Sequence, residues 1–211
     1  MATVAEKSGM KLQFVELTSI NDELLLPWLD LYETSFPPEE KILVSGFFRF
    51  LDPDFKEDGV ESRLVAVLDE RGEFVGLMFY RVRAETGVFS LWYLATRPEL
   101  RGSGLGAECY REVLRRAQES GSSFVFFEVE VPEDSPDSEI ARRRIEFYRR
   151  LGAKLLRGIR LTQKMGDHTR EVQMNIMIHP LKPVTPQQAF DLATQYVDNE
   201  GLRQVGELAL E

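Results

Sequence analysis

The chain has 211 residues, of which 43% are hydrophobic and 29% charged, a balance typical of one folded domain and not of a disordered segment. Its formal net charge of −9 argues against nucleic acid as a partner, because phosphate binding requires a basic surface, whereas a cationic substrate would suit it. The single cysteine, Cys109, excludes an intramolecular disulfide and a cysteine-rich zinc site, and with only His168 and His179 as histidines we expect no metal.

Residues 1–10 are expected to form a flexible leader. They lack the basic and apolar regions of a signal peptide. No apolar run in the chain approaches the roughly 20 residues that a membrane-spanning helix needs. We therefore expect a cytoplasmic protein that has no membrane partner.

Residues 11–182 show the periodicity of one domain of mixed strands and helices. A strand is predicted over 11–17, and two short helices follow it, the first ending before Pro37 and the second running from Pro38 to Phe50. Antiparallel strands are predicted at 63–69, 73–83 and 88–96, then a helix that opens at Gly104 or Gly106, then a buried parallel strand at 123–131.

The second half of this domain is predicted to hold one more helix and a hairpin. Ser138 should cap the helix, Gly152 should end it, and Ile140, Ile145, Tyr148 and Leu151 should face inward. The hairpin pairs 153–164 with 170–179 and turns at Gly166 and Asp167. This order predicts a mixed α/β sheet of the α+β kind and not a succession of βαβ units.

Residues 183–211 are predicted to form a C-terminal helical extension. Thr185 can cap a helix over 185–200 that carries Phe190, Ala193 and Val197 on one stripe. This stripe is expected to pack on the domain, and a contact in a homodimer is a second possible use.

The most informative stretch lies between the strand at 88–96 and the helix after it, and reads Arg-Pro-Glu-Leu-Arg-Gly-Ser-Gly-Leu-Gly from Arg97 to Gly106. Three glycines within five residues allow the backbone to approach a bulky ligand and to turn its N–H groups into one small space. The same residues open a helix, whose N-terminus favours negative charge. The pattern therefore predicts a cradle for a pyrophosphate.

This stretch resembles the acyl-CoA-binding loop of the GNAT acetyltransferase superfamily, with Arg101, Gly104 and Gly106 at the motif positions. The resemblance implies the GNAT fold for residues 11–182, a mostly antiparallel sheet with a central, splayed parallel pair flanked by helices. It implies acetyl-CoA as co-substrate, with the pyrophosphate on the N–H groups of Gly102, Ser103, Gly104, Leu105 and Gly106. It also implies that the backbone of Leu94, Ala95 and Thr96 pairs with the pantetheine arm, because the strand would separate from its neighbour there.

One rival interpretation uses the same glycines. Gly102, Gly104 and Ala107 also fit the G-x-G-x-x-A pattern of dinucleotide-binding folds, and Glu128 lies near the place of the ribose-binding acid. Against it, residues 97–101 separate the preceding strand from the first glycine, and that strand ends an antiparallel meander. A glycine-rich loop without any ligand is the third possibility.

Transfer of an acetyl group to an amine requires a base for the amine and an acid for the departing thiolate. By resemblance to the family's Phe-Tyr segment ahead of a glycine, Tyr148 is the acid, although its apolar neighbours also fit a residue of the core. Two positions depart from the family pattern: Ala141 stands where many members have Asn, and Ala153 where many have Phe. These departures concern the thiol end of the site.

Glu128 and Glu130 are the candidate bases. Alternation along the strand places both on one face, opposite Phe127, Val129 and Val131. Either could take a proton from an ammonium or bind it, and a solvated strand end is the plain alternative. Glu33, between the two early helices, is a third candidate.

The sequence therefore favours an N-acetyltransferase that transfers an acetyl group from acetyl-CoA to a primary amine, with a small molecule as the favoured acceptor, by direct attack in a ternary complex. A protein N-terminus or lysine is the alternative acceptor. A non-catalytic module that binds acyl-CoA is the alternative from another class.

Overall fold

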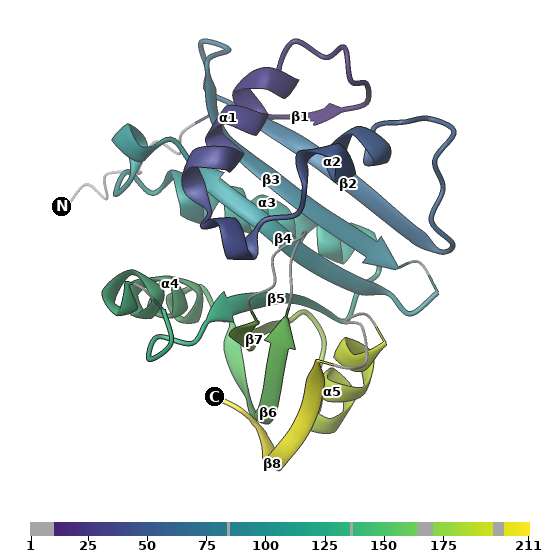
Figure 1. The fold of residues 1–211 in the computed structure, drawn as a ribbon, viewed down its shortest axis with the longest axis vertical. Helices are drawn as coiled ribbons and strands as arrows, with labels where there is room; N and C mark the ends of the chain where they lie inside the picture. Colours follow the sequence, from purple (N-terminus) through teal and green to yellow (C-terminus); the bar gives the residue numbers. More distant parts are fainter. Residues whose placement is uncertain (1–10, 84, 136, 164–170, 196–200) are drawn as a thin grey trace, which may run out of the picture.

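One eight-stranded sheet organises the computed structural model, which describes residues 11–83, 85–135, 137–163, 171–195 and 201–211. The strands lie in the order β1 (Gln13–Leu17), β2 (Val60–Leu68), β3 (Phe74–Arg83), β4 (Val88–Thr96), β5 (Phe124–Glu130), β7 (Val172–Pro180), β6 (Lys154–Gln163) and β8 (Leu202–Leu210). Every neighbouring pair is antiparallel except β4 and β5, which run parallel (Figure 1). The mixed, mostly antiparallel sheet predicted from the sequence is confirmed.

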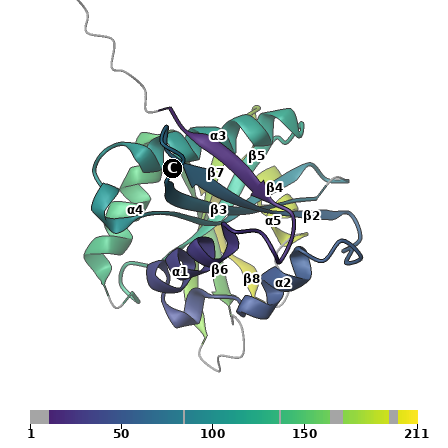
Figure 2. The same ribbon diagram turned by 90° about the horizontal axis from the view of Figure 1, so that it is seen from above.

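Helices cover both faces of the sheet (Figure 2). They are α1 (Leu25–Ser35), α2 (Val44–Phe50), α3 (Leu105–Glu119), α4 (Ser138–Arg150) and α5 (Pro186–Thr194), with short 3₁₀ turns η1 (Pro38–Glu40) and η2 (Pro98–Leu100). The first two pack on β2–β4 through Trp28, Tyr32 and Phe47, which are fully buried. On the opposite face, α3 and α4 share a core cluster with β3, β4 and β5 that contains Tyr110 and Tyr148.

The feature that positions the site is the separation of β4 from β5. Only Phe89–Val125 and Ser90–Phe126 are paired between them, and the strands then diverge (Figure 1). Close to this point β4 holds one extra residue against β3, because the register passes from Leu91 to Tyr93 and leaves Trp92 without a partner. Such a bulge bends a strand and increases its twist, which accounts for the divergence.

The predicted second helix does not begin at Pro38. The turn η1 ends at Glu40, the backbone is extended at Lys41 and Leu43, and α2 begins only at Val44. At Ile42, the N–H donates to the hydroxyl of Tyr93 and the carbonyl accepts from Tyr32, at 3.1 and 2.9 Å. The two tyrosines thus form the hydrogen bonds with the N–H and the carbonyl of Ile42 that neighbouring turns would form in a continuous helix.

Four further predictions are corrected by the structure. Asp137 and not Ser138 caps α4, because its carboxylate accepts from the N–H of Ile140 at 3.0 Å, and Ile140 is exposed and does not face inward. The strand at 123–131 is parallel to β4 over two pairs only and antiparallel to β7. The extension after residue 183 is not helical throughout, since β8 joins the sheet beside β6.

Other expectations hold where the structure describes them. Gly152 ends α4 with φ +101°, and Thr185 caps α5 in a reciprocal pair of hydrogen bonds with Gln188. Residues 1–10, the hairpin turn at Gly166 and Asp167, and Val197 lie outside the described residues.

Candidate active site

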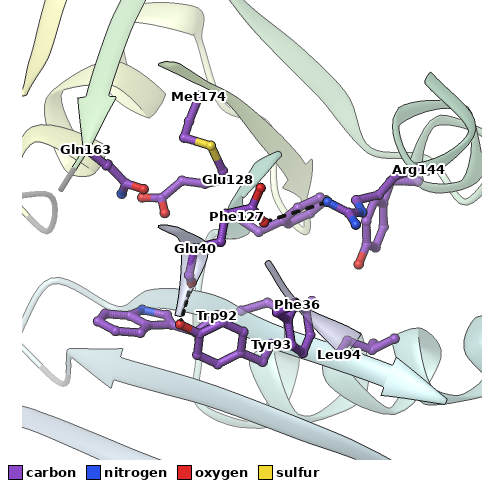
Figure 3. A pocket seen from close by; sticks show the side chains of 12 residues that line it. Phe36, Glu40, Trp92, Tyr93, Leu94, Phe127, Glu128, Arg144, Gln163 and Met174 are labelled. Carbon is purple, nitrogen blue, oxygen red and sulfur yellow. Dashed lines mark hydrogen bonds and ion pairs between the residues drawn. The ribbon is translucent and has the colours of Figure 1, made fainter. Parts of the chain in front are cut away.

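A pocket of about 80 Å³ opens in the gap between β4 and β5. Its walls come from both diverging strands, from α4, from β6 and β7, and from the segment that follows α1 (Figure 3). Two of the three predicted catalytic residues, Glu128 and Tyr148, line this pocket. The structure thus brings together side chains that are 20 residues apart in the sequence.

Glu128 lies on β5 opposite Ile176 of β7, and its side chain faces Gln163 at the end of β6 (Figure 3). The side-chain amide of Gln163 forms a hydrogen bond with the carboxyl group of Glu128, which favours the ionised form. Burial opposes ionisation more strongly, and it raises the pKa of Glu128 to about 7. A carboxyl group with this pKa can accept and release a proton near neutral pH.

Tyr148 lies on α4 and is 8% exposed. Its ring packs against Phe127 of β5, with centroids 4.3 Å apart, and against Tyr110 of α3, with centroids 5.0 Å apart. Burial raises the pKa of its hydroxyl to about 12. The hydroxyl therefore keeps its proton at neutral pH and can donate it.

Glu130, the other predicted base, has different surroundings. Its carboxylate accepts from Arg144 of α4 at 2.7 Å and from the hydroxyl of Ser135 at 3.1 Å. It lines a second cavity of about 270 Å³ and not the pocket of Glu128. Its carboxylate is therefore held by Arg144 and Ser135 outside the pocket that contains Glu128.

Glu33 does not line either cavity, since its half-exposed side chain forms an ion pair with Lys41. Arg144 belongs to a run of three arginines on α4, and its side chain is partly buried and lines the pocket of Glu128.

The glycine loop forms an open, positively polarised surface at the start of α3. Gly102 and Gly104 have φ of +81° and +93°, and a Cβ at either position would meet no atom within 4 Å. Within the described residues, the N–H groups of Gly102, Gly104 and Gly106 donate to no acceptor. These donors at a helix N-terminus fit a pyrophosphate.

The other predicted loop residues differ in what they present. Arg101 and Ser103 are exposed, whereas the side chain of Leu105 is buried, so that only its backbone can contact a ligand. Along β4, Leu94, Ala95 and Thr96 pair with β3 on one side and have no partner in β5 on the other. This unpaired edge leads from the loop to the pocket and fits an extended amide-containing arm.

Among the charged and amide side chains of the pocket, sequence reasoning missed Glu40, Arg144 and Gln163. Glu40 follows two prolines, Arg144 stands in a run of three arginines, and Gln163 ends a strand. None of these contexts differs from that of an ordinary surface residue, so the sequence held no signal that could have found them.

A model of the Acetyltransferase (GNAT) family matches residues 23–153. The chain belongs to this family. It is an acetyltransferase that depends on acetyl-CoA, and the dinucleotide-binding interpretation of the glycines is wrong. No curated protein matches the chain.

Solved structures of GNAT proteins share the fold. A GNAT-family protein from Bacteroides thetaiotaomicron has a TM-score of 0.71 and 19% identity over 89% of this chain and 97% of that chain. A GNAT acetyltransferase from Elizabethkingia anophelis with acetyl-CoA bound has a TM-score of 0.55 and 11% identity, with coverage of 81% and 98%. The ribosomal-protein-S18-alanine N-acetyltransferase from Escherichia coli has a TM-score of 0.56 and 16% identity, with coverage of 83% and 97%. In the part of this chain that the structure describes, no helix is long and apolar enough to cross a membrane.

Proposed function

We propose that this GNAT enzyme transfers the acetyl group of acetyl-CoA to a small primary amine, by direct attack within a ternary complex. The observation that carries the proposal is the presence of Glu128 and Tyr148 in one pocket, where the strands diverge. Burial raises the pKa of both groups, and the values of about 7 and about 12 suit a base and an acid at neutral pH.

The residues divide the work of the reaction between them. Acetyl-CoA, when bound, supplies the thioester carbon that the amine attacks, so that a C–N bond forms as the C–S bond breaks. Glu128 takes the proton that the ammonium must lose to become a nucleophile, directly or through water. Tyr148 gives its proton to the departing sulfur, and both groups return to their starting states by exchange with solvent. The loop at 102–106 would hold the pyrophosphate, and the free edge of β4 would align the arm.

The charge of the site supports a cationic acceptor. Glu128 faces the pocket, and the adjoining cavity is lined by Glu39, Glu40, Glu130, Asp134 and Glu171. The net charge of −9 adds a long-range attraction for cations. Both cavities are small, which favours a small amine over a folded protein.

The acceptor class can be tested by release of free thiol from acetyl-CoA, with the acetylated product identified by mass spectrometry. The panel should include alkyl amines, amino acid amides and peptides that present a free N-terminus or lysine. Turnover of small amines with little turnover of peptides supports the proposal. The reverse order would favour a protein acceptor and would contradict it.

The protonation of Glu128 predicts the pH dependence of turnover. Because the base must be ionised, kcat at saturating substrates should fall as pH falls through about 7, and it should approach a tenfold loss per pH unit well below this value. In the Glu128→Gln variant, kcat should no longer show this fall at low pH, the acidic limb of the pH profile. A limb that persists unchanged in the variant would remove Glu128 as the base.

Tyr93 is expected to support the acceptor side of the pocket without contacting the cofactor loop. Its hydroxyl donates to the carbonyl of Glu40 at 2.9 Å and accepts from the N–H of Ile42 at 3.1 Å. Tyr93→Phe leaves both backbone groups without this partner and should lower the free energy of unfolding by about 1–2 kcal/mol. The KM for the amine should rise while the affinity for acetyl-CoA stays unchanged. Urea denaturation and steady-state kinetics measure the two effects, and an equal rise in both KM values would contradict this assignment.

A further inference from the structure

Glu40 stands at the junction of the two cavities. It lines the pocket that holds Glu128 and Tyr148, and it also lines the second cavity beside Glu130. Its side chain is 12% exposed, although it belongs to a connection between two helices. A carboxyl group is rarely buried to this degree unless it is paired or bound to a ligand.

The backbone around Glu40 is fixed in place. The hydroxyl of Tyr93, on β4, accepts a hydrogen bond from the N–H of Ile42 and donates one to the carbonyl of Glu40. The hydroxyl of Tyr32, on α1, donates to the carbonyl of Ile42. Figure 3 shows the bond between Tyr93 and Glu40 beneath the pocket. The backbone that carries the Glu40 side chain is thus held by buried side chains from two other elements.

Among the described residues, the buried carboxyl groups of Glu40 and Glu130 share one cation. The carboxyl group of Glu40 forms a hydrogen bond with that of Glu130 from β5, and Glu39 adds negative charge from the same turn as Glu40. Among the described residues, the cation in ion-pairing range is Arg144 of α4, whose Nη1 lies 3.9 Å from Glu40 but 2.7 Å from Glu130. The guanidinium of Arg144 is therefore shared by two buried carboxyl groups, and it lies closer to Glu130 than to Glu40.

The consequence is a proton held on this pair. Burial, and then the charge of Glu130, raise the pKa of Glu40 to about 8, while Arg144 lowers it in part. A second cation placed beside the pair would replace the proton, because it would remove the repulsion that retains it. The cavity of about 270 Å³ next to Glu40 and Glu130 offers the space for such a cation.

We propose that Glu40 determines acceptor specificity by binding, together with Glu130, the second ammonium group of a diamine or polyamine whose first amino group reacts in the pocket of Glu128. This inference rests on the proposed function, since it assigns the acceptor of the same site. The two ammonium groups occupy the two adjoining cavities, and binding of the second releases the proton of the Glu40–Glu130 pair to the solvent.

The test compares amines that differ only in the second charge. Putrescine and cadaverine are matched with butylamine and pentylamine, and spermidine extends the series. Affinity is measured by calorimetry in buffers of different ionisation enthalpy at pH 7, and kcat/KM is measured with acetyl-CoA. Wild-type protein should favour at least one diamine over its monoamine by about tenfold or more and should release up to about one proton on binding it.

Glu40→Gln is the decisive variant. Its amide can donate to Glu130 as the protonated carboxyl group does, so the variant should fold. It should lose most of the preference for diamines, measured as the ratio of kcat/KM for a diamine to that for its monoamine, and it should lose the extra proton release. Glu133→Gln is the control, because it removes the same charge at an exposed residue that lines neither cavity.

The outcomes separate this inference from the proposed function. The inference is overturned, even if amines are acetylated, if the wild type shows the same affinity and kcat/KM for every diamine and its matched monoamine. It is also overturned if the preference for diamines is unchanged in Glu40→Gln. Acetylation of no amine, combined with diamine binding that depends on Glu40, would support Glu40 and Glu130 as the site of the second ammonium group and would overturn the proposed function.

Discussion

Replacing Gly104 by glutamate is expected to abolish measurable binding of acetyl-CoA to a protein that is still folded. Gly104 has φ +93° immediately before α3, and its missing side chain leaves open space in front of three free N–H groups. A glutamate there would occupy that space and place a negative charge against the pyrophosphate. Like charges about 4 Å apart at a protein surface repel by about 4 kcal/mol, so we expect an affinity loss of about 100-fold or more.

Gly72→Glu provides a matched control for this variant. Gly72 lies in the turn between β2 and β3, has φ +81°, and likewise has no atom within 4 Å of a Cβ. Both substitutions carry a similar cost of backbone strain, about 1–2 kcal/mol, and the same change of charge. Thermal denaturation should therefore show similar losses of stability, while calorimetric titration should show a loss of acetyl-CoA affinity in Gly104→Glu alone. Undiminished affinity in Gly104→Glu would exclude the loop as the pyrophosphate site.

The sequence predicted the glycine loop well because its conformation depends on local properties. Gly102 and Gly104 adopt positive φ, which glycine accepts without strain, and the strand before them has the predicted bounds, Val88–Thr96. Apolar alternation also placed Glu128 and Glu130 on one face of β5. Periodicity in a single strand and the conformational preference of a single residue are sufficient for inferences of this kind.

What the sequence could not supply depends on contacts between distant residues. The interruption of the second helix results from Tyr32 and Tyr93, which take the hydrogen bonds of Ile42. The different surroundings of Glu128 and Glu130 result from Gln163 on one side and Arg144 on the other, and neither partner is near them in sequence. The strand β8 was missed for another reason, since the side chains from Arg203 to Glu207 are exposed and show no alternation.

Replacing Tyr148 by phenylalanine is expected to reduce kcat by roughly 100-fold or more, because the departing thiolate would lose its proton donor. The ring would keep its contacts with Phe127 and Tyr110, so the fold and the shape of the pocket should be unchanged. The affinity for acetyl-CoA should also stay the same, since the loop that would hold the pyrophosphate lies at the start of a different helix. Single-turnover kinetics at saturating acetyl-CoA would measure the chemical step directly.

The control for this variant is Tyr110→Phe, which removes a hydroxyl from a fully buried neighbouring ring. That hydroxyl contacts Nδ1 of His179 at 3.3 Å and does not line the pocket. Tyr110→Phe should therefore affect stability more than kcat, whereas Tyr148→Phe should affect kcat more than stability. Equal and small losses of kcat in the two variants would identify Tyr148 as a residue of the core, and the proton for the sulfur would then have to come from water. A loss confined to Tyr148→Phe distinguishes the two tyrosines by their access to the pocket, because both are buried and both keep their protons at neutral pH.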